Sequence, residues 1–369
     1  MMDSVLRIPI NTKSRNYEAL IEHGVLSRTG EILRKTLGSV PPVFIVTVLP
    51  VRRRWGKVLS RSLESAGFVP RFVEMRDGER HKRLSTVDQL ADNLVRLGAD
   101  RKGLIIAFGG GVVGDVAGML ASVYMRGVKL VQIPTTVQAQ LDAAIGGKTG
   151  VNLVTGKNLV GTFYQPEVVL IDPATLETLP AREFRSGMYE ALKAGIIGKP
   201  ELFAQLESVS IKTLREEPAA TACAITESVK LKAEVVSADE REGDLRRALN
   251  LGHTIGHALE AATEYKHFLH GEAVAWGMQA AARIALEMRV CDSETYQRIC
   301  HAVHAWGPLP EVNVQNAKAL KLMQSDKKTE SGTVTFVLPK MIGKVEMVKN
   351  VPESAIVAAL AEIRRASRA

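Results

Sequence analysis

Short apolar strands alternate with amphipathic helices through the first half of the chain, and this alternation limits the fold more than any other feature. Such a rhythm builds βαβ units and a mainly parallel sheet that is covered on both faces. Ligands bind to sheets of this kind at the carboxyl ends of the strands. The predicted strands are 5–10, 43–48, 71–75, 104–108, 129–133 and 168–171, and the predicted helices are 52–66 and 85–97.

Helical periodicity dominates after about Pro180. The predicted helices are 183–197, 219–239, 249–262, 273–288 and 293–305, followed by a hairpin of 333–338 with 344–348 and a terminal helix. A chain of 369 residues agrees with two domains of ordinary size. We therefore predict an α/β protein, with a mainly parallel sheet domain at 1–180 and a mostly α-helical domain at 181–369.

Charge and cysteine content exclude several functional classes. The formal charge is +8, but the cations are scattered and aromatic residues make up only 5%, so we expect no nucleic-acid binding. A positive field that attracts an anionic metabolite fits the charge better. Cys223, Cys291 and Cys300 form no Cys-x-x-Cys motif, which indicates a reducing compartment. With no long apolar run or leader pattern, we expect a cytoplasmic protein with no membrane partner.

A glycine-rich loop follows the predicted strand 104–108. Its sequence, Gly109-Gly110-Gly111-Val112-Val113-Gly114, fits the dinucleotide fingerprint, in which backbone amides approach a pyrophosphate at a helix start. The acidic residue expected about 20 positions later is absent. A structural tight turn is the alternative, but with Asp115 near the start of the next helix we interpret the loop as a nucleotide site of a non-standard kind.

A second glycine motif, Gly146-Gly147-Lys148-Thr149, resembles part of a phosphate-binding P-loop. It lacks the earlier glycine that the P-loop needs, because Asp142 occupies that place. The P-loop interpretation therefore fails. The polar cluster that remains suits an oxygen-rich, anionic ligand, and it consists of Asp142, Lys148, Thr149, Asn152, Lys157 and Asn158.

Histidines in the second half form a possible transition-metal pattern. His253 and His257 are four residues apart and share one face of a predicted helix, and His270 follows after a turn-like stretch. A pair at this spacing is also common on helices that bind no metal. Glu190 and Lys193 lie three apart on another helix, either as a surface ion pair or as a partly buried pair with Glu190 free to act as a ligand.

Taken together, these stretches resemble the 3-dehydroquinate synthase family of sugar-phosphate cyclases from about Asp77 to about Gly343. The motifs that carry the resemblance are Asp77-Gly78-Glu79-Arg80-His81-Lys82, Gly109 to Asp115, Tyr124-Met125-Arg126-Gly127, Pro134-Thr135-Thr136, Asp142 to Asn152, Gly156-Lys157-Asn158, Glu190-x-x-Lys193, Arg246 to His257, His270-Gly271-Glu272 and Asp326-Lys327-Lys328.

The resemblance implies one NAD, one divalent metal (zinc or possibly cobalt) and a homodimer. The implied metal ligands are Glu190, His253 and His270, whereas spacing alone pairs His253 with His257. The implied NAD contacts are Asp77, Glu79, Lys82, Gly110, Gly111, Val112, Val113, Gly114, Asp115, Thr135, Thr136, Lys148, Lys157, Thr175 and Thr178. The implied catalytic and substrate-binding residues are His257, Lys148, Asp142, Lys193, Lys232, Arg246, Asn250, Asn158, Lys327 and, across the dimer, Arg126.

On this resemblance, domain 1–180 binds NAD and domain 181–369 binds metal and substrate. One departure is Thr47-Val48, where the family usually has Thr-Asp and its aspartate holds the adenosine ribose. The implied reaction converts 3-deoxy-D-arabino-heptulosonate 7-phosphate to 3-dehydroquinate and phosphate in the shikimate pathway. It proceeds by transient oxidation, phosphate elimination, re-reduction and intramolecular aldol cyclisation. The alternatives are a cyclase for sedoheptulose 7-phosphate or glucose 6-phosphate, a metal-dependent alcohol dehydrogenase, and a non-enzymatic basic binding module.

Overall fold

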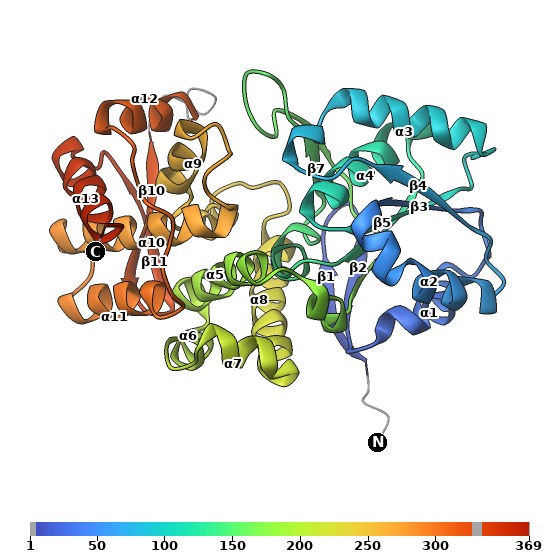
Figure 1. Cartoon of the computed structure of the whole chain (residues 1–369), viewed down its shortest axis with the longest axis horizontal. Coiled ribbons are helices and arrows are strands. Elements are labelled where there is room, and N and C mark those ends of the chain that lie inside the picture. Colours follow the sequence, from blue (N-terminus) through green and yellow to red (C-terminus); the bar gives the residue numbers. More distant parts are fainter. Residues whose placement is uncertain (1–4, 327–333, 369) are drawn as a thin grey trace. The chain divides into compact units, whose positions relative to one another are not determined.

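The computed structural model describes residues 5–326 and 334–368 of the chain (Figure 1). The chain divides into two compact units. The first unit contains Met1–Pro180 together with Lys232–Arg241, and the second contains Ala181–Leu231 and Glu242–Ala369. Each unit has its own layers and is described by itself.

The first unit is built on a seven-stranded sheet in the order β1-β2-β9-β6-β5-β3-β4. All neighbouring pairs are parallel except β1 with β2, so the mainly parallel sheet is confirmed. Its strands are β1 (Leu6–Asn11), β2 (Asn16–Ile21), β3 (Val43–Val48), β4 (Pro70–Met75), β5 (Leu104–Gly109), β6 (Lys129–Pro134) and β9 (Val168–Ile171). Its main helices are α1 (Thr29–Leu37), α2 (Leu49–Ser65), α3 (Leu84–Arg96) and α4 (Gly111–Val123).

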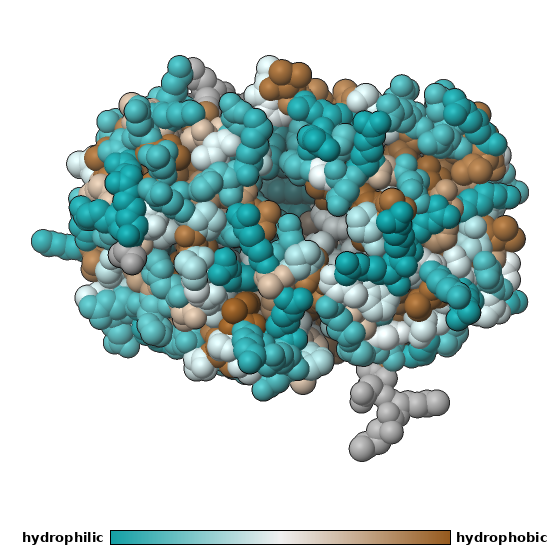
Figure 2. Space-filling model, viewed as in Figure 1, coloured by the Kyte–Doolittle hydropathy of each residue, from teal (hydrophilic) through white to brown (hydrophobic). Residues whose placement is uncertain are grey.

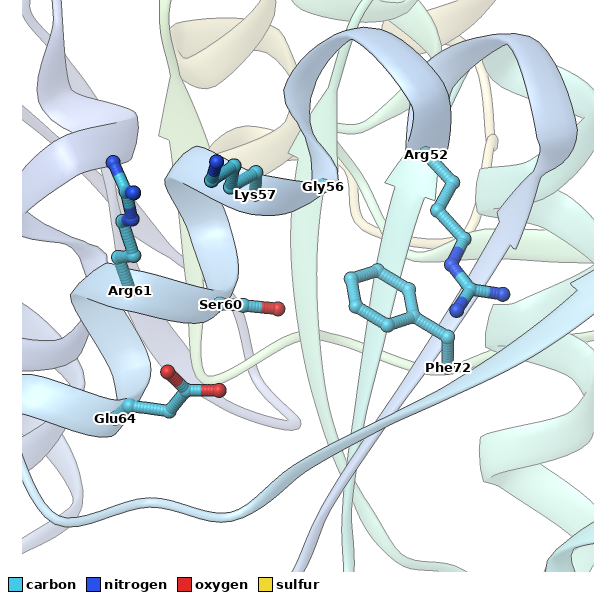
Figure 3. Close-up of a pocket in the computed structure, with 7 residues that line it drawn as sticks. All are labelled: Arg52, Gly56, Lys57, Ser60, Arg61, Glu64 and Phe72. Atoms are coloured by element: carbon cyan, nitrogen blue, oxygen red, sulfur yellow. The ribbon is translucent and has the colours of Figure 1, made fainter.

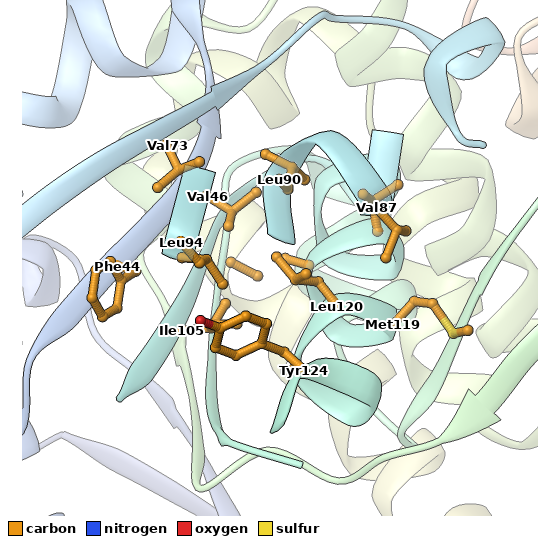
Figure 4. Close-up of a cluster of buried hydrophobic side chains, with 14 of the residues drawn as sticks. Phe44, Val46, Val73, Val87, Leu90, Leu94, Ile105, Met119, Leu120 and Tyr124 are labelled. Carbon is orange, nitrogen blue, oxygen red and sulfur yellow. The ribbon is translucent and has the colours of Figure 1, made fainter. Parts of the chain in front are cut away.

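The central strands are apolar on both faces because helices cover both faces. Successive side chains of a strand point to opposite sides. In β3, Phe44 and Val46 join one buried cluster with residues of α3 and α4 (Figure 4). Val43 and Ile45 of the same strand join a second cluster with residues of α1 and α2. Burying each such side chain contributes about 1.5–3 kcal/mol, so the continuous apolar runs stabilise the sheet from both sides.

Helix α1 and two smaller pieces of the first unit were not predicted. A two-stranded ribbon pairs β7 (Lys148–Val151) with β8 (Val160–Phe163). Lys148 therefore begins a strand, whereas a P-loop lysine would lie at the start of a helix, which supports rejection of the P-loop. The strand β2 also escaped prediction, because its sequence Asn-Tyr-Glu-Ala-Leu-Ile alternates only weakly between polar and apolar residues.

The second unit is mostly helical, as predicted. Its helices are α5 (Ala181–Gly198), α6 (Pro200–Glu207), α7 (Ile211–Glu216), α8 (Pro218–Ala238), α9 (His253–Ala262), α10 (His270–Glu287), α11 (Ser293–His304), α12 (Asn316–Asp326) and α13 (Glu353–Ala366). The part of α8 from Lys232 onwards belongs to the first unit. The predicted hairpin is present as β10 (Thr335–Met341) with β11 (Lys344–Lys349). Helix α10 is buried along most of its length, from Gly271 to Ala285, which is typical of a central core helix.

Two helix boundaries differ from the predicted ones, and both differences bear on the histidines. Helix α9 begins at His253 instead of Leu249, because Gly252 has φ 79° and separates α9 from the short 3-10 helix Leu245–Asn250. Helix α10 begins at His270 instead of Ala273. His270 is therefore the first residue of a helix and not part of the preceding turn.

The segment Lys232–Arg241 packs with the first unit, whereas the predicted division placed it in the second. Side-chain contacts account for this. Lys232 donates to the backbone oxygen of Asp142 at 2.6 Å, and the Asn11 amide donates to Ser237 Oγ at 3.0 Å. These partners are distant in the sequence, so helical periodicity could not reveal them.

Hydrophilic side chains cover most of the molecular face in Figure 2, and hydrophobic residues are scattered among them in small groups. Within the described part of the chain, none of the helices combines the length and apolar character needed to cross a bilayer.

Candidate functional site

Three segments of the second unit bring a carboxylate and two imidazoles together. Glu190 lies in the middle of α5, His253 begins α9 and His270 begins α10. These residues can meet because the helices pack closely at two glycines. A Cβ at Gly277 would overlap the Gly252 carbonyl oxygen, and a Cβ at Gly271 would overlap that of Ser186. The absent side chains let α10 approach both the start of α9 and the helix that carries Glu190.

The start of α10 is also held by an ion pair between the buried Glu272 and the exposed Arg182. Glu272 is fully buried and accepts two hydrogen bonds from Arg182, Nε to Oε1 at 2.7 Å and Nη2 to Oε2 at 2.8 Å. It accepts a third from the Leu269 amide at 2.9 Å. A bidentate arginine fixes geometry as well as energy. His270 therefore starts from a well-defined backbone position.

Glu190, His253 and His270 each offer one ligand atom within 4.8 Å of the others. The imidazole rings of His253 and His270 are 5.2 Å apart between centroids, and His270 Nε2 lies 3.5 Å from Glu190 Oε1. His253 and His257 do share a face of α9, with ring centroids 5.2 Å apart, as their spacing predicts. The group that contains Glu190, however, joins His253 to His270 and not to His257.

The pKa values of the two imidazoles are shifted in opposite directions. Burial, together with the nearby Lys193 ammonium, holds the pKa of His253 well below its usual value, so this ring is neutral at pH 7. Burial also opposes charge on His270, but the Glu260 and Glu190 carboxylates outweigh it and raise the pKa of that ring. A neutral imidazole and an acidic neighbourhood are both suited to a cation.

Glu190 and Lys193 form a buried pair and not a surface pair. Their exposed fractions are 2% and 5%, and Lys193 Nζ lies 2.5 Å from Glu190 Oε2. Neither Glu190 oxygen accepts a hydrogen bond from the described residues. A buried carboxylate with unused acceptor capacity is costly unless another cation completes its surroundings.

Glu260 is a further acidic group at this cluster, and it was not predicted as a site residue. It lies on α9 three residues after His257 and accepts from His270 Nδ1 at 3.2 Å. His257, Glu260 and His270 form a second group with ligand geometry. The sequence could have indicated Glu260, because it falls on the same helix face as His253 and His257.

The remaining predicted residues of the second unit precede α9 or lie outside the described range. Arg246 is 2% exposed and, with Asn250, belongs to the 3-10 helix Leu245–Asn250 that leads to His253. Lys327 falls outside the described residues.

The glycine loop of the first unit lies at the carboxyl end of β5. Gly110 caps α4, which begins at Gly111, so free backbone amides of the first turn are available to an anion. A Cβ at Gly111 would contact Ala143, and one at Gly110 would contact Thr136. Thr135 is buried, and its hydroxyl has no hydrogen-bond partner among the described residues. The loop therefore resembles a cradle more than a simple tight turn.

Several predicted cofactor residues form one network beside this loop. Lys82 pairs with Asp115 and donates to Asn158 Oδ1 at 2.6 Å. Asp115 lies in the second turn of α4 and serves this pair instead of the helix start. Asn152 donates to Glu79 Oε1 at 2.7 Å, and Lys157 Nζ lies 3.8 Å from the same oxygen.

Asp142 and Lys232 meet in the first unit although they are far apart in the sequence. Their side chains form an ion pair, and Lys232 is 8% exposed. Asp142 lies in a π-helical turn, Ala139–Ala143, a local widening that is frequent at functional sites. Lys148 is exposed at the start of β7.

Other predicted residues lie apart from these networks or are engaged elsewhere. The Thr175 hydroxyl donates to Asp172 O at 2.8 Å and accepts from Gln140 at 3.0 Å, and Thr178 accepts from Trp55 at 3.1 Å. Asp77 is exposed after β4. Arg126 is exposed with φ 69°, in a turn where Met125 also has positive φ.

A shallow hollow on α2 and β4 is not a candidate site. Its lining includes the cations Arg52, Lys57 and Arg61 and the ring of Phe72 (Figure 3). Arg52 already pairs with Glu74 at 2.5 Å and lies 4.7 Å above the Phe72 ring. None of the lining residues belongs to the networks described above.

Two solved synthases that bind NAD+ are similar in structure to this chain over nearly its whole length. The structure of 2-epi-5-epi-valiolone synthase from Streptomyces hygroscopicus, with NAD+ and Zn2+ bound, covers 99% of this chain and 100% of its own, with a TM-score of 0.87 and 27% identity. That of 2-deoxy-scyllo-inosose synthase with carbaglucose-6-phosphate, NAD+ and Co2+ covers 97% and 99%, with a TM-score of 0.85 and 25% identity.

Sequence comparison is more specific. The family model for the N-terminal domain of 3-dehydroquinate synthase matches residues 72–186, and the model for its C-terminal domain matches 187–329. The 3-dehydroquinate synthase of Koribacter versatilis is 50% identical over 358 residues, which are 97% of this chain and 98% of that protein. The matched ranges contain both the glycine loop and the Glu190, His253 and His270 group. The chain therefore belongs to the 3-dehydroquinate synthase family.

Proposed function

We propose that the protein is a 3-dehydroquinate synthase, an NAD- and metal-dependent carbon-oxygen lyase. It converts 3-deoxy-D-arabino-heptulosonate 7-phosphate to 3-dehydroquinate and phosphate. The observation that carries the proposal is the buried Glu190 carboxylate facing His253 and His270 in a chain 50% identical, over nearly its full length, to a protein of that name.

The donor set fits one divalent metal. Glu190 would supply an oxygen, and His253 and His270 would each supply a nitrogen, which is a common ligand set for catalytic zinc. The Glu190 oxygens accept no hydrogen bond from the described residues, and His253 is already neutral. Three protein ligands leave coordination positions for a substrate hydroxyl. Zinc and cobalt are the ions in the related cyclase structures, and we propose one of these here.

The first unit fits NAD. The amides at the start of α4 would face the pyrophosphate, and Thr135 and Thr136 follow the adjacent strand β6. Lys82 holds Asp115 and Asn158 together and adds positive charge near the same loop. At the end of β3, Val48 cannot accept a hydrogen bond from a ribose hydroxyl as an aspartate would. NAD, when bound, supplies reversible hydride transfer, and the metal polarises the reacting oxygen.

The side chains would bind the anionic substrate and move its protons. Lys148, Asn158, Asp142 and Lys232 of the first unit and Lys193, Arg246 and Asn250 of the second are the proposed substrate contacts, with Lys327 outside the described residues. The cations would offset the carboxylate and phosphate charges of the substrate. The family resemblance implies that His257 is the proton-transfer group, and its position beside His253 agrees with that role.

Phosphate release tests the proposal. The purified protein, supplied with NAD and zinc, is expected to release phosphate from the heptulosonate phosphate with no net change in NADH absorbance. Sedoheptulose 7-phosphate and glucose 6-phosphate serve as controls for the related cyclases. Net NADH formation would indicate an alcohol dehydrogenase, and preference for either control sugar would indicate a different cyclase.

The proposal includes a cytoplasmic homodimer in which Arg126 reaches the phosphate at the partner's site. The exposed position of Arg126 on a turn with positive φ at two consecutive residues supports a role outside its own unit. Sedimentation velocity checks it. A strictly monomeric protein with full activity would remove the shared site.

A further inference from the structure

We propose that Glu260 is a positioning residue that fixes the tautomer and ring orientation of His270. Its carboxylate accepts the Nδ1 proton of His270, which leaves the Nε2 lone pair free for a metal ion. This inference depends on the metal centre proposed above and assigns a role to a residue outside the ligand set.

The two nitrogens of His270 face two different carboxylates. Nδ1 lies 3.2 Å from Glu260 Oε2, and Nε2 lies 3.5 Å from Glu190 Oε1. The nitrogens are on opposite edges of the ring, so one ring links the Glu190 group to Glu260. A neutral imidazole has a single N–H, and the partner of one nitrogen decides which nitrogen keeps a lone pair.

His253 shows the same arrangement with a backbone partner. Its Nδ1 lies 3.1 Å from the carbonyl oxygen of Leu251. A carbonyl oxygen only accepts, so Nδ1 carries the proton and the lone pair of Nε2 is free for a metal ion. Both proposed imidazole ligands are thus oriented through Nδ1, one by the main chain and the other by Glu260. In both histidines an acceptor binds the Nδ1 proton and leaves Nε2 free, which supports the same role for the two acceptors.

Because Glu260 is buried, losing its hydrogen bond with His270 would be destabilising. Glu260 is 3% exposed and lies among the apolar residues of α9, where Leu259 is fully buried. A buried carboxylate is destabilising unless charged or hydrogen-bonding partners offset the loss of water. Hydrogen bonds from a metal-bound histidine to a buried carboxylate also raise the basicity of the ligand, and removing such a partner weakens metal affinity about 10–100-fold.

Glu260 could instead bind the metal directly, because His257, Glu260 and His270 also have ligand spacing. The Glu190 group is favoured, since the Glu190 oxygens accept no hydrogen bond from the described residues, whereas Glu260 already accepts from His270. A direct ligand and a positioning residue differ in how severely their loss affects the metal.

The experiment measures zinc affinity of the full-length protein by competition with a chelator, without substrate. Glu260→Leu is expected to weaken zinc binding about 10–100-fold. Glu260→Gln keeps the shape and an acceptor oxygen, so a smaller loss is expected. Glu264→Gln is the matched control, because Glu264 is exposed beyond the end of α9 and pairs with Lys266. Glu190→Gln provides the reference for loss of a true ligand.

Two spectroscopic readouts separate positioning from a general effect on folding. The visible spectrum of the cobalt form is expected to shift in Glu260→Leu and to stay unchanged in Glu264→Gln. In 15N-histidine spectra of the zinc form, His270 is expected to carry its proton on Nδ1. Far-UV circular dichroism of the metal-free variants confirms that each is folded.

Wild-type zinc affinity and cobalt spectrum in both Glu260 variants would overturn the inference while leaving the metal centre intact. A loss in Glu260→Gln as severe as in Glu190→Gln would also overturn it, because Glu260 would then be a ligand. If the wild-type protein binds no zinc, the proposed centre fails and the inference with it.

Discussion

The two candidate regions are built in opposite ways. The glycine loop of the first unit uses backbone groups from one short stretch, Gly109 to Gly114, at the end of a buried strand. The proposed metal-binding group of the second unit uses side chains from α5, α9 and α10, and two glycines allow these helices to pack closely. We expect the glycine loop to tolerate side-chain changes nearby, because it uses backbone groups. The geometry of the proposed ligands, in contrast, depends on the position of each helix that carries one.

Loss of a ligand is expected to have the largest effect. His253→Ala removes one of three proposed donors, so zinc affinity falls by more than the roughly 100-fold limit typical of indirect partners, and activity disappears. We expect the fold to remain, because His253 is the first residue of α9. Metal analysis and circular dichroism measure both. His257→Ala is the control and should retain the metal, and full metal occupancy in His253→Ala would remove the ligand assignment.

A methyl group added where α10 packs against the start of α9 is expected to have the next largest effect. In Gly277→Ala the new Cβ meets the Gly252 carbonyl, so α10 and the start of α9 must separate at a cost of about 3 kcal/mol. Thermal unfolding of the metal-free protein and zinc affinity should both decrease. Gly111→Ala is the contrasting change, because its Cβ would lie 3.3 Å from Ala143 Cβ, a tight contact that a shift of a few tenths of an ångström would relieve. Equal destabilisation by the two would contradict the contrast between the regions.

Breaking the Lys82 network should weaken cofactor binding alone. Lys82→Met removes the ion pair to Asp115 and the hydrogen bond to Asn158, and contacts of this kind contribute about 1.5–3 kcal/mol. We expect NAD affinity to fall at least about tenfold, with zinc affinity unchanged, as measured by calorimetry. Lys57→Met, in the hollow of Figure 3, is the control with no expected effect. A matching loss of zinc would show that the two regions are not independent.

The smallest expected effect is a pH dependence in the first unit. Burial favours the neutral form of Glu240, but hydrogen bonds from Ser14 and Gln165 outweigh it and lower its pKa. A lowered folded-state pKa stabilises the protein above the unfolded value of about 4.3, and this stabilisation is lost as the pH falls through the folded value.

Glu240→Gln should therefore lower the free energy of unfolding at pH 7 by about 1 kcal/mol, and its difference from wild type should shrink towards pH 3. Denaturant unfolding at several pH values measures this. A difference that grows in acid would mean that the pKa of Glu240 is raised.

Much of the first unit followed from the sequence. The run from Val43 to Val48 became β3 as predicted, because a buried parallel strand needs apolar side chains on both faces. The glycine loop after β5 and the helical character of the second half were also predicted, because each depends on a pattern of residues that are close in the sequence. The mainly parallel sheet is confirmed.

Long-range pairing could not be predicted in this way. Lys232 meets Asp142 and packs with the first unit, although helical periodicity placed it with the second. The spacing of His253 and His257 correctly placed both on one helix face, but the partner that joins His253 beside Glu190 is His270. A local pattern cannot predict that His270 is the partner, because this depends on where α10 begins and how closely it packs against α5 and α9.

The sequence by itself determined the α/β class, the glycine loop and the set of residue types able to bind a metal and an anionic substrate. The tertiary structure decided which of them meet: the buried Glu190 with His253 and His270, and Glu260 with the other nitrogen of His270. The physical reason is that periodicity is a property of neighbouring residues, whereas coordination requires atoms from distant segments to come within a few ångströms of one another. Here that distance is set by glycines whose missing side chains leave room for the helices to touch.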